Sequence, residues 1–104
     1  RKKDMIKTGG ENVPTREVEE AIYLDPRVQE VAVIGLPDPK WVEKVTAVIV
    51  PKAGQTITEE EIFAHCRREL AAFKCPKKVI FVDALPKTPT GKILKRELRQ
   101  RYNK

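Results

Sequence analysis

Apolar residues recur at helical spacing in the middle of the chain and predict a helix there. The residues four apart that would form its buried face are Ile62, Cys66 and Leu70. Thr58 and Glu61 have the spacing of a capping box, in which each side chain bonds to the other residue's backbone N–H, so Thr58 is the expected N-cap. Ile57 and Ile62 stand at the positions of a hydrophobic staple across this start, which makes the helix the best-defined element in the sequence.

Three runs rich in valine and isoleucine predict strands at residues 28–36, 44–50 and 78–85. Their apolar positions are nearly continuous, which is typical of buried strands. Prolines follow the first two runs, and a proline cannot donate a hydrogen bond to a neighbouring strand. We therefore expect the first strand to end before Pro37 and the second to end at Pro51.

A hairpin and a helix are expected before the first strand. Two short extended segments flank Gly9-Gly10, a pair typical of a tight turn. Thr15 is the expected N-cap of the helix, which ends near Leu24 because Asp25-Pro26 follows. The apolar face of this helix contains Val18 and Ile22.

A last helix is expected from Ile93 or Leu94 to Tyr102. Its predicted buried residues are Leu94, Leu98 and Tyr102, and its predicted outward-facing residues are Lys95, Arg96, Arg99 and Arg101. The complete order of elements predicts one domain over residues 1–104 of the α+β class. We expect two layers, with helices packed on a three-stranded core sheet and a small N-terminal β-hairpin beside it.

The charge of the chain points to an anionic ligand without identifying it. The net charge is +6, and the positive residues are densest from Lys74 onward. This fits a nucleic acid, a phosphate-rich small molecule or simply a solvated basic face. Two cysteines, Cys66 and Cys75, and one histidine cannot form a four-ligand zinc site. Low cysteine content and the absence of a membrane span or signal peptide favour the cytoplasm.

Lys92 is the first candidate for chemistry. It follows Gly91 at the expected start of the last helix, where the helix dipole favours anions, so a lysine there makes sense if an anion arrives from outside. The segment is not a phosphate-binding P-loop, because Pro86 replaces its first glycine and Ile93 replaces its serine or threonine. On these residues alone, the favoured interpretation is a proline-rich turn that enters a basic surface helix.

Four segments resemble the C-terminal domain of acyl-CoA synthetases, within the adenylate-forming enzymes. They are RKKDMIKTGGENV at 1–13, GLPDPKW at 35–41, FKCPK at 73–77 and LPKTPTGK at 85–92. They occur in the family's order and at about its spacing, so the resemblance covers the whole chain.

The resemblance implies two half-reactions. A carboxylate attacks the α-phosphate of ATP to give an acyl-adenylate and pyrophosphate, and a thiol, usually that of coenzyme A, then displaces AMP. It also implies that the chain is the mobile lid of a larger enzyme, which rotates between the two steps. The lid is then inactive without its N-terminal domain, and Mg²⁺ is expected to bind outside it.

The resemblance assigns roles to individual residues. Lys92 matches the adenylation lysine, Lys3 the hinge residue, and Arg1 an arginine that borders the nucleotide. Gly9 and Gly10 match the loop that lines the pantetheine tunnel, with Gly10 expected to be the closer contact. The residues that match contacts to the nucleotide end of coenzyme A in some relatives are Trp41, Phe73 and Lys77.

Two alternatives stay open at this point. An amino-acid-activating domain of a peptide synthetase would load a carrier protein instead of coenzyme A. A small basic nucleic-acid-binding module would account for the charge, although no nucleic-acid-binding motif is present and no specific nucleic acid is expected as a partner.

Overall fold

The computed structural model describes residues 5–102 of the chain. The elements, in order, are β1 (Met5–Thr8), β2 (Glu11–Pro14), α1 (Thr15–Tyr23), β3 (Val28–Asp38), β4 (Val42–Pro51), α2 (Glu59–Glu69), the short 3-10 helix η1 (Ala72–Lys74), β5 (Lys78–Phe81) and α3 (Lys95–Tyr102). None of the helices in this described part is long and apolar enough to cross a membrane.

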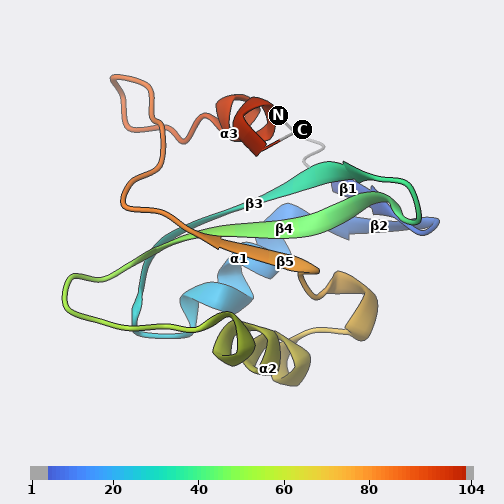
Figure 1. Ribbon diagram of the computed structural model, residues 1–104, viewed down its shortest axis with the longest axis horizontal. Coiled ribbons are helices and arrows are strands. Elements are labelled where there is room, and N and C mark those ends of the chain that lie inside the picture. Colours follow the sequence, from blue (N-terminus) through green and yellow to red (C-terminus); the bar gives the residue numbers. More distant parts are fainter. Residues whose placement is uncertain (1–4, 103–104) are drawn as a thin grey trace.

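The sheet is built around β4 (Figure 1). β3 pairs antiparallel with β4, and the short β5 pairs parallel with it. The antiparallel β1–β2 hairpin joins the same sheet through a single pair, Thr8 with Val42. The predicted α+β class is therefore confirmed, and the expected hairpin extends the core strands into one sheet of five.

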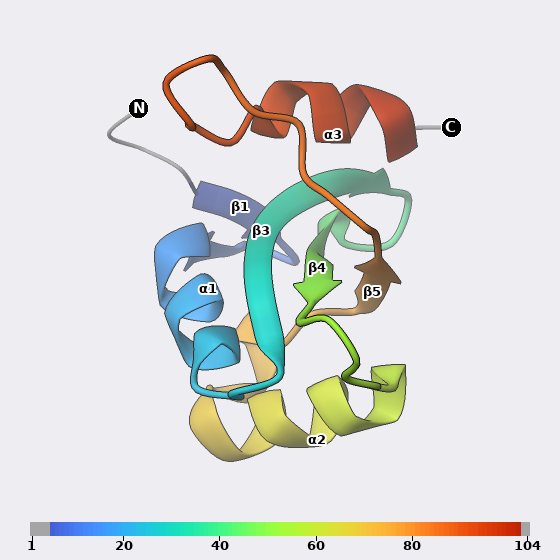
Figure 2. The same ribbon diagram turned by 90° about the vertical axis from the view of Figure 1, so that its left-hand side faces the viewer.

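Both faces of the sheet are covered. Every residue from 31 to 36 of β3 and from 45 to 50 of β4 is buried. Because successive side chains point to opposite faces, such a run requires cover on both sides. One apolar cluster includes Val33 and Ile49, and the other includes Ile34 and Leu98. Figure 2 shows α1 and α2 on one face and α3 on the other, so α3 adds a third layer to the expected two.

The β3 strand passes the point at which Pro37 was expected to end it. The N–H groups of Val31 and Val33 point away from β4, where they donate to the Tyr23 hydroxyl (3.3 Å) and the Glu19 carboxylate (2.9 Å). With the period of two along a strand, the nitrogen of Pro37 also faces this outer edge. The proline thus removes no bond to β4, and the strand continues to Asp38.

The start of α2 is confirmed in detail. Thr58 Oγ1 accepts from the N–H of Glu61 (3.2 Å), and the Glu61 carboxylate accepts from the N–H of Thr58 (3.0 Å). The prediction for α1 was wrong in one respect, because Pro14 is the N-cap and Thr15 is the first helical residue. Thr15 is buried, so its side chain faces the interior and does not cap the helix.

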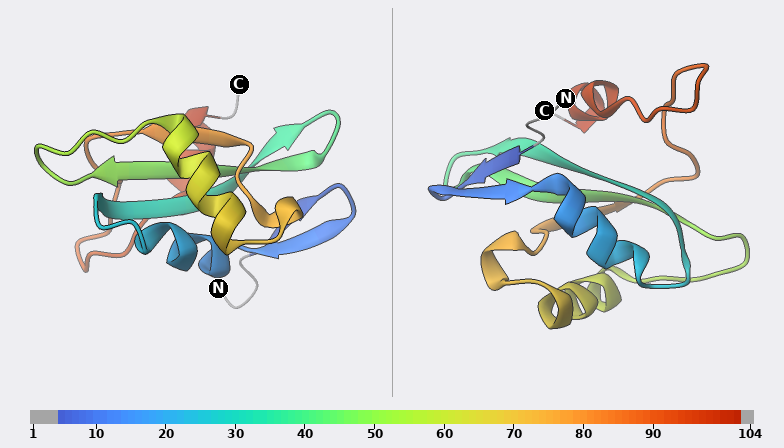
Figure 3. Two further views of the ribbon diagram at one scale, coloured as in Figure 1. Left: turned by 90° about the horizontal axis from the view of Figure 1, so that it is seen from below. Right: turned by 180° about the vertical axis from the view of Figure 1, so that it is seen from behind.

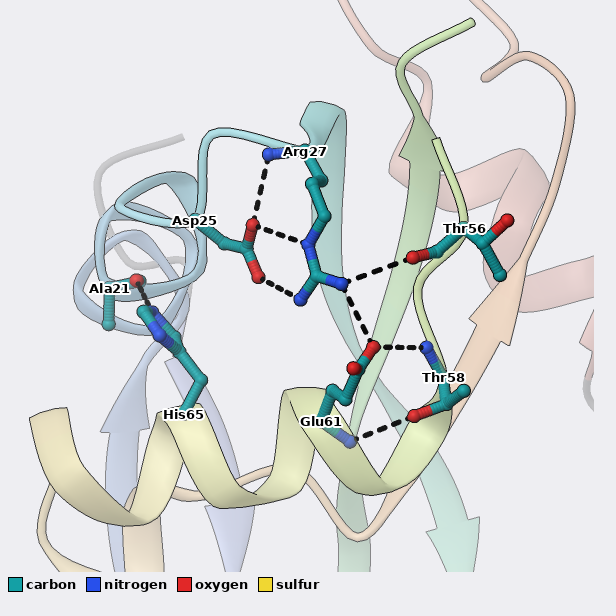
Figure 4. Close-up of polar contacts among 7 residues, drawn as sticks. All are labelled: Ala21, Asp25, Arg27, Thr56, Thr58, Glu61 and His65. Carbon is teal, nitrogen blue, oxygen red and sulfur yellow. Dashed lines mark hydrogen bonds and ion pairs between the residues drawn. The ribbon is translucent and has the colours of Figure 1, made fainter. Parts of the chain in front are cut away.

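Polar contacts tie α1 to α2, which lie side by side on one face (Figure 3). Arg27 contacts the carboxylates of both Asp25 (2.9 Å) and Glu61 (3.0 Å), and His65 Nε2 lies 2.6 Å from the Ala21 carbonyl oxygen (Figure 4). The Arg27 hydrogen bond holds the pKa of Asp25 below its ordinary value. These contacts fix the helical layer against which β3 and β4 pack.

Candidate functional site

A hollow of about 380 Å³ lies where the two β-hairpins meet η1. Its lining residues are Thr8, Gly9, Glu11, Trp41, Ala72, Phe73 and Lys77. Four of them, Gly9, Trp41, Phe73 and Lys77, are residues that the family resemblance singled out from three separate parts of the chain. The fold therefore brings these candidates together on one surface.

The backbone N–H and carbonyl groups of Trp41 both form hydrogen bonds that fix its position. The Asp38 carboxylate accepts from the N–H groups of Lys40 (2.8 Å) and Trp41 (3.0 Å), and these bonds hold the pKa of Asp38 below its ordinary value. The Trp41 carbonyl accepts from the N–H of Gly9 (2.8 Å). The next residue, Val42, has φ of 73°, a conformation that a β-branched residue rarely adopts. The turn around Trp41 is thus fixed by local bonds at the expense of backbone strain.

The two glycines of the first hairpin differ in their surroundings. Both have positive φ, 56° for Gly9 and 87° for Gly10, so the tight turn itself requires them. A Cβ on Gly9 would lie 2.9 Å from Trp41 Cε3, whereas a Cβ on Gly10 would meet nothing within 4 Å. The lining of the hollow contains Gly9 and not Gly10. The expectation that Gly10 makes the closer contact to a pantetheine arm stays a prediction.

Positive charge surrounds the aromatic rings of the hollow. The ammonium groups of Lys40 and Lys77 lie 5.1 Å and 5.2 Å from the centre of the Trp41 ring. Lys74 lies 5.6 Å from the Phe73 ring and also forms an ion pair with Glu17 (2.9 Å). An aromatic ring flanked by lysines provides a stacking surface and countercharges for phosphate at the same place.

One polar atom of the lining has its hydrogen-bonding capacity unused. The hydroxyl of Thr8 is buried and has no hydrogen-bond partner within residues 5–102. A buried hydroxyl without a partner is costly. The groups that the hollow offers to a ligand are the aromatic surface and the lysines.

Lys92 lies in a loop and not at the start of a helix. The predicted last helix is present and reaches Tyr102, but it begins at Lys95, one residue after Leu94, and an isolated bridge between Lys87 and Ile93 closes a tight loop before it. Gly91 has φ of 90° at the tip of this loop. The helix dipole therefore does not explain the position of Lys92.

The Lys92 ammonium is exposed, and no acidic side chain within the described range 5–102 forms an ion pair with it. Its neighbours behave differently. Lys87 pairs with Glu30 and Lys95 pairs with Glu19 (2.8 Å), on either side of the loop. Lys95 was expected to face outward, but it is half-buried because it also reaches Thr15 Oγ1 (3.2 Å). The loop thus presents one uncompensated cation between two neutralised ones.

The Lys92 loop and the hollow lie toward opposite ends of the molecule, whose longest dimension is 38 Å (Figure 1). The loop follows β5 and leads into α3, and the hollow lies at the ends of β1, β2 and the β3–β4 turn. A single orientation of the domain can therefore present only one of the two to a partner surface.

The remaining predictions concern Arg1, Lys3 and the binding of a metal. Arg1 and Lys3 lie outside the described residues. Between residues 5 and 102, no group of three or more His, Cys, Asp or Glu side chains is placed to hold a metal ion. No pattern in the sequence singled out Thr8 or Lys40 as a site residue, although both lie within segments that carry the family resemblance.

The chain matches the family model described as the AMP-binding enzyme C-terminal domain over residues 17–92. It is 52% identical over 103 residues to a long-chain-fatty-acid–CoA ligase of Mycobacterium tuberculosis, covering 99% of this chain and 20% of the ligase. It is 51% identical over 102 residues to a feruloyl-CoA synthase of an Amycolatopsis species, covering 98% of this chain and 21% of the synthase.

Solved structures agree with these relatives. The structure of ATP-bound MatB from Rhodopseudomonas palustris matches with a TM-score of 0.94 and 47% identity, over 98% of this chain and 20% of MatB. A Mycobacterium tuberculosis fatty acyl CoA synthetase matches with a TM-score of 0.91 and 52% identity, over 98% of this chain and 20% of the synthetase. The chain thus spans about a fifth of the length of the relatives that it matches.

Proposed function

The chain belongs to the family of C-terminal domains of AMP-binding enzymes, and from this premise we propose that it is the mobile lid of a carboxylate–CoA ligase. The lid supplies Lys92 to adenylate formation and the hollow around Trp41 to thioester formation. ATP, coenzyme A and a fatty acid or related carboxylate are the substrates. The larger N-terminal part of the enzyme is the partner, and it holds the acid, ATP and Mg²⁺. Without that part the domain is expected to have no turnover.

The observation that carries the proposal is the uncompensated ammonium of Lys92 on a hydrogen-bonded loop. Adenylate formation brings a carboxylate and a triphosphate together, so negative charge gathers at the α-phosphate as the new bond forms. A cation fixed in advance stabilises that charge most strongly where water is excluded. Among the residues that the structure describes, Lys92 has no ion pair to be broken before it meets such an anion, whereas Lys87 and Lys95 do.

The hollow around Trp41 suits coenzyme A. The ring of Trp41 can stack on adenine, and Lys40 and Lys77 can pair with phosphate groups. Gly9 lets the Trp41 ring pack closely against the first hairpin, because a Cβ at position 9 would lie 2.9 Å from Trp41 Cε3.

The separation of Lys92 from the hollow supports a rotation between the half-reactions. The two surfaces lie at opposite ends of the domain, so one active site in the larger part of the enzyme would meet them in turn (Figure 1). The lid would present Lys92 during activation of the acid and then turn the hollow toward the acyl-adenylate.

The test is Lys92→Ala in the full-length enzyme. We expect adenylate formation to fall by about 10²–10³-fold, the usual loss when one preorganised charge-stabilising group is removed. Conversion of supplied acyl-adenylate to the thioester should stay within about twofold of the unmodified enzyme, because the hollow is unchanged. Pyrophosphate release measures the first step, and release of AMP in the presence of coenzyme A measures the second.

Lys52→Ala is the matched control, since Lys52 is an exposed lysine in the loop after β4. It should leave both steps unchanged. An equal loss of both steps in Lys92→Ala would contradict the assigned role, because the lysine would then not be specific to activation. Transfer of the acyl group to a carrier protein in preference to coenzyme A would favour the peptide-synthetase alternative.

A further inference from the structure

We propose that Thr88 is a positioning residue for Lys92, acting through a hydroxyl group that orients the lysine's backbone. The inference rests on the proposed role of Lys92 in adenylate formation. It starts from the loop that connects β5 to α3, whose residues 86–94 are held by backbone and side-chain bonds within the loop itself.

The base of the loop is closed by main-chain contacts. The N–H of Leu94 donates to the Pro86 carbonyl (2.9 Å), and Lys87 forms a bridge with Ile93. Two ion pairs also tie the ends of the loop to the body of the domain. Lys87 pairs with Glu30 on β3, and Lys95 pairs with Glu19 on α1. The remaining freedom is therefore in the tip, which includes Lys92.

Thr88 accounts for both backbone hydrogen bonds of Lys92. The N–H of Thr88 donates to the Lys92 carbonyl (2.8 Å), and the N–H of Lys92 donates to Thr88 Oγ1 (3.1 Å). The Thr88 carbonyl also accepts from Gly91 N–H (2.9 Å). Because the peptide groups before and after Lys92 both bond to one residue, the direction of its Cα–Cβ bond is fixed relative to Thr88.

The hydroxyl of Thr88 is the part of this arrangement that a substitution can remove cleanly. It accepts from Lys92 and lies 2.8 Å from the hydroxyl of Thr90, whereas the other bonds of Thr88 use its backbone. Valine has nearly the same shape but no hydroxyl, so Thr88→Val deletes the bond to Lys92 N–H and keeps the main-chain bonds. Thr88→Ser keeps the hydroxyl and deletes only the methyl group.

The expected effect is selective for one half-reaction. A displacement of about 1 Å at a group that acts on a transition state can cost about 10²-fold in rate. In the full-length enzyme, we expect Thr88→Val to lower kcat for adenylate formation by about 10–100-fold, with KM for ATP within about threefold. Thr88→Ser should restore kcat to within about threefold of the unmodified enzyme. Thioester formation from supplied acyl-adenylate should stay within about twofold in both variants.

Thr90→Val is the matched control within the same loop, because the Thr90 hydroxyl contacts Thr88 and makes no bond to Lys92. It should cost adenylate formation about threefold at most. Hydrogen exchange provides a readout that does not depend on activity: the peptide that contains Lys92 should exchange faster in Thr88→Val than in Thr90→Val, with the rest of the domain unchanged.

Three results would overturn the inference: equal losses in Thr88→Val and Thr90→Val, no rescue by serine, or unchanged exchange at Lys92. The proposed function is tested separately by Lys92→Ala. If Lys92→Ala abolishes adenylate formation while Thr88→Val leaves it intact, only the positioning role is wrong. If Lys92→Ala itself leaves adenylate formation intact, the proposed function is wrong and Thr88 has no catalytic lysine to position.

Discussion

Comparing Gly9→Ala with Gly10→Ala tests whether the contact of Gly9 with Trp41 matters, because the two glycines of the first hairpin differ in this contact. Gly9 has φ of 56° and Gly10 has φ of 87°, so alanine at either position carries the cost of a left-handed conformation. That cost is about 1–2 kcal/mol for a residue with a Cβ. Both variants should therefore carry a similar backbone cost, and the pair is matched for backbone strain.

The difference lies in what the new methyl group would meet. At position 9 it would lie 2.9 Å from Trp41 Cε3 and 3.2 Å from Cζ3, whereas at position 10 it would lie in open space. Carbon atoms prefer separations of about 3.5–4.0 Å, so either the Trp41 ring or the hairpin must withdraw by about 0.6–1.1 Å. The hairpin cannot simply move away, because the Gly9 N–H is bonded to the Trp41 carbonyl.

A displaced ring should weaken coenzyme A binding without affecting the acid-activating step. We expect Gly9→Ala to raise KM for coenzyme A by about tenfold, which corresponds to about 1.4 kcal/mol. Gly10→Ala should raise it by about twofold at most. The assay is thioester formation from supplied acyl-adenylate in the full-length enzyme at varied coenzyme A concentration, with pyrophosphate release measured separately.

A greater impairment in Gly10→Ala than in Gly9→Ala would refute this reasoning. It would mean that ligand contact at position 10, and not the packing of Gly9 on Trp41, controls the hollow. A loss of adenylate formation in Gly9→Ala would also refute it, because the Lys92 loop lies at the other end of the domain.

Two further predictions concern the stability of the domain. Val42 is exposed and has φ of 73°, so in urea unfolding the Val42→Gly variant should be more stable than the Val42→Ala variant by about 1 kcal/mol. The control is Arg68 in α2, where Arg68→Gly should be less stable than Arg68→Ala. The same order of stability at both positions would contradict the strain at Val42. Asp25→Asn should lower the free energy of unfolding at pH 7 by about 1–3 kcal/mol, because the Arg27 hydrogen bond lowers the native pKa of Asp25 below 3.8. The difference in stability between the variant and the unmodified protein should disappear as the pH falls through the native pKa of Asp25. A difference that persists in strong acid would contradict this role of the Asp25 carboxylate.

Elements defined by local interactions could be predicted from the sequence. The start of α2 depends on Thr58 and Glu61, which lie three residues apart, and both predicted bonds are present. The buried strands could be predicted because unbroken apolar runs need cover on both faces. The sequence did not indicate that α3 supplies one of these covers.

Contacts between distant residues could not be predicted from such patterns. Lys95 was expected to face outward because it lies off the apolar stripe of the last helix, but its partners Glu19 and Thr15 come from the other end of the chain. Likewise, nothing in the periodicity places Trp41 beside Phe73. The family resemblance proposed both for one ligand, and the fold places both in the lining of one hollow.

The departures from local rules are concentrated at the two candidate surfaces. Near the hollow, β3 continues through Pro37 and Val42 adopts a conformation that usually requires glycine. Near Lys92, the expected helix start is replaced by a closed loop with Gly91 at its tip. By contrast, α2 contributes no residue to the lining of the hollow or to the Lys92 loop, and it follows its sequence signals closely. Backbone strain persists only where the surrounding structure compensates for it, as the Asp38 bonds do beside Val42; at the other surface, the Thr88 hydroxyl accepts from the N–H of Lys92. If those bonds serve to hold Trp41 and Lys92 in place, removing either one should change a single half-reaction more than it changes the stability of the fold.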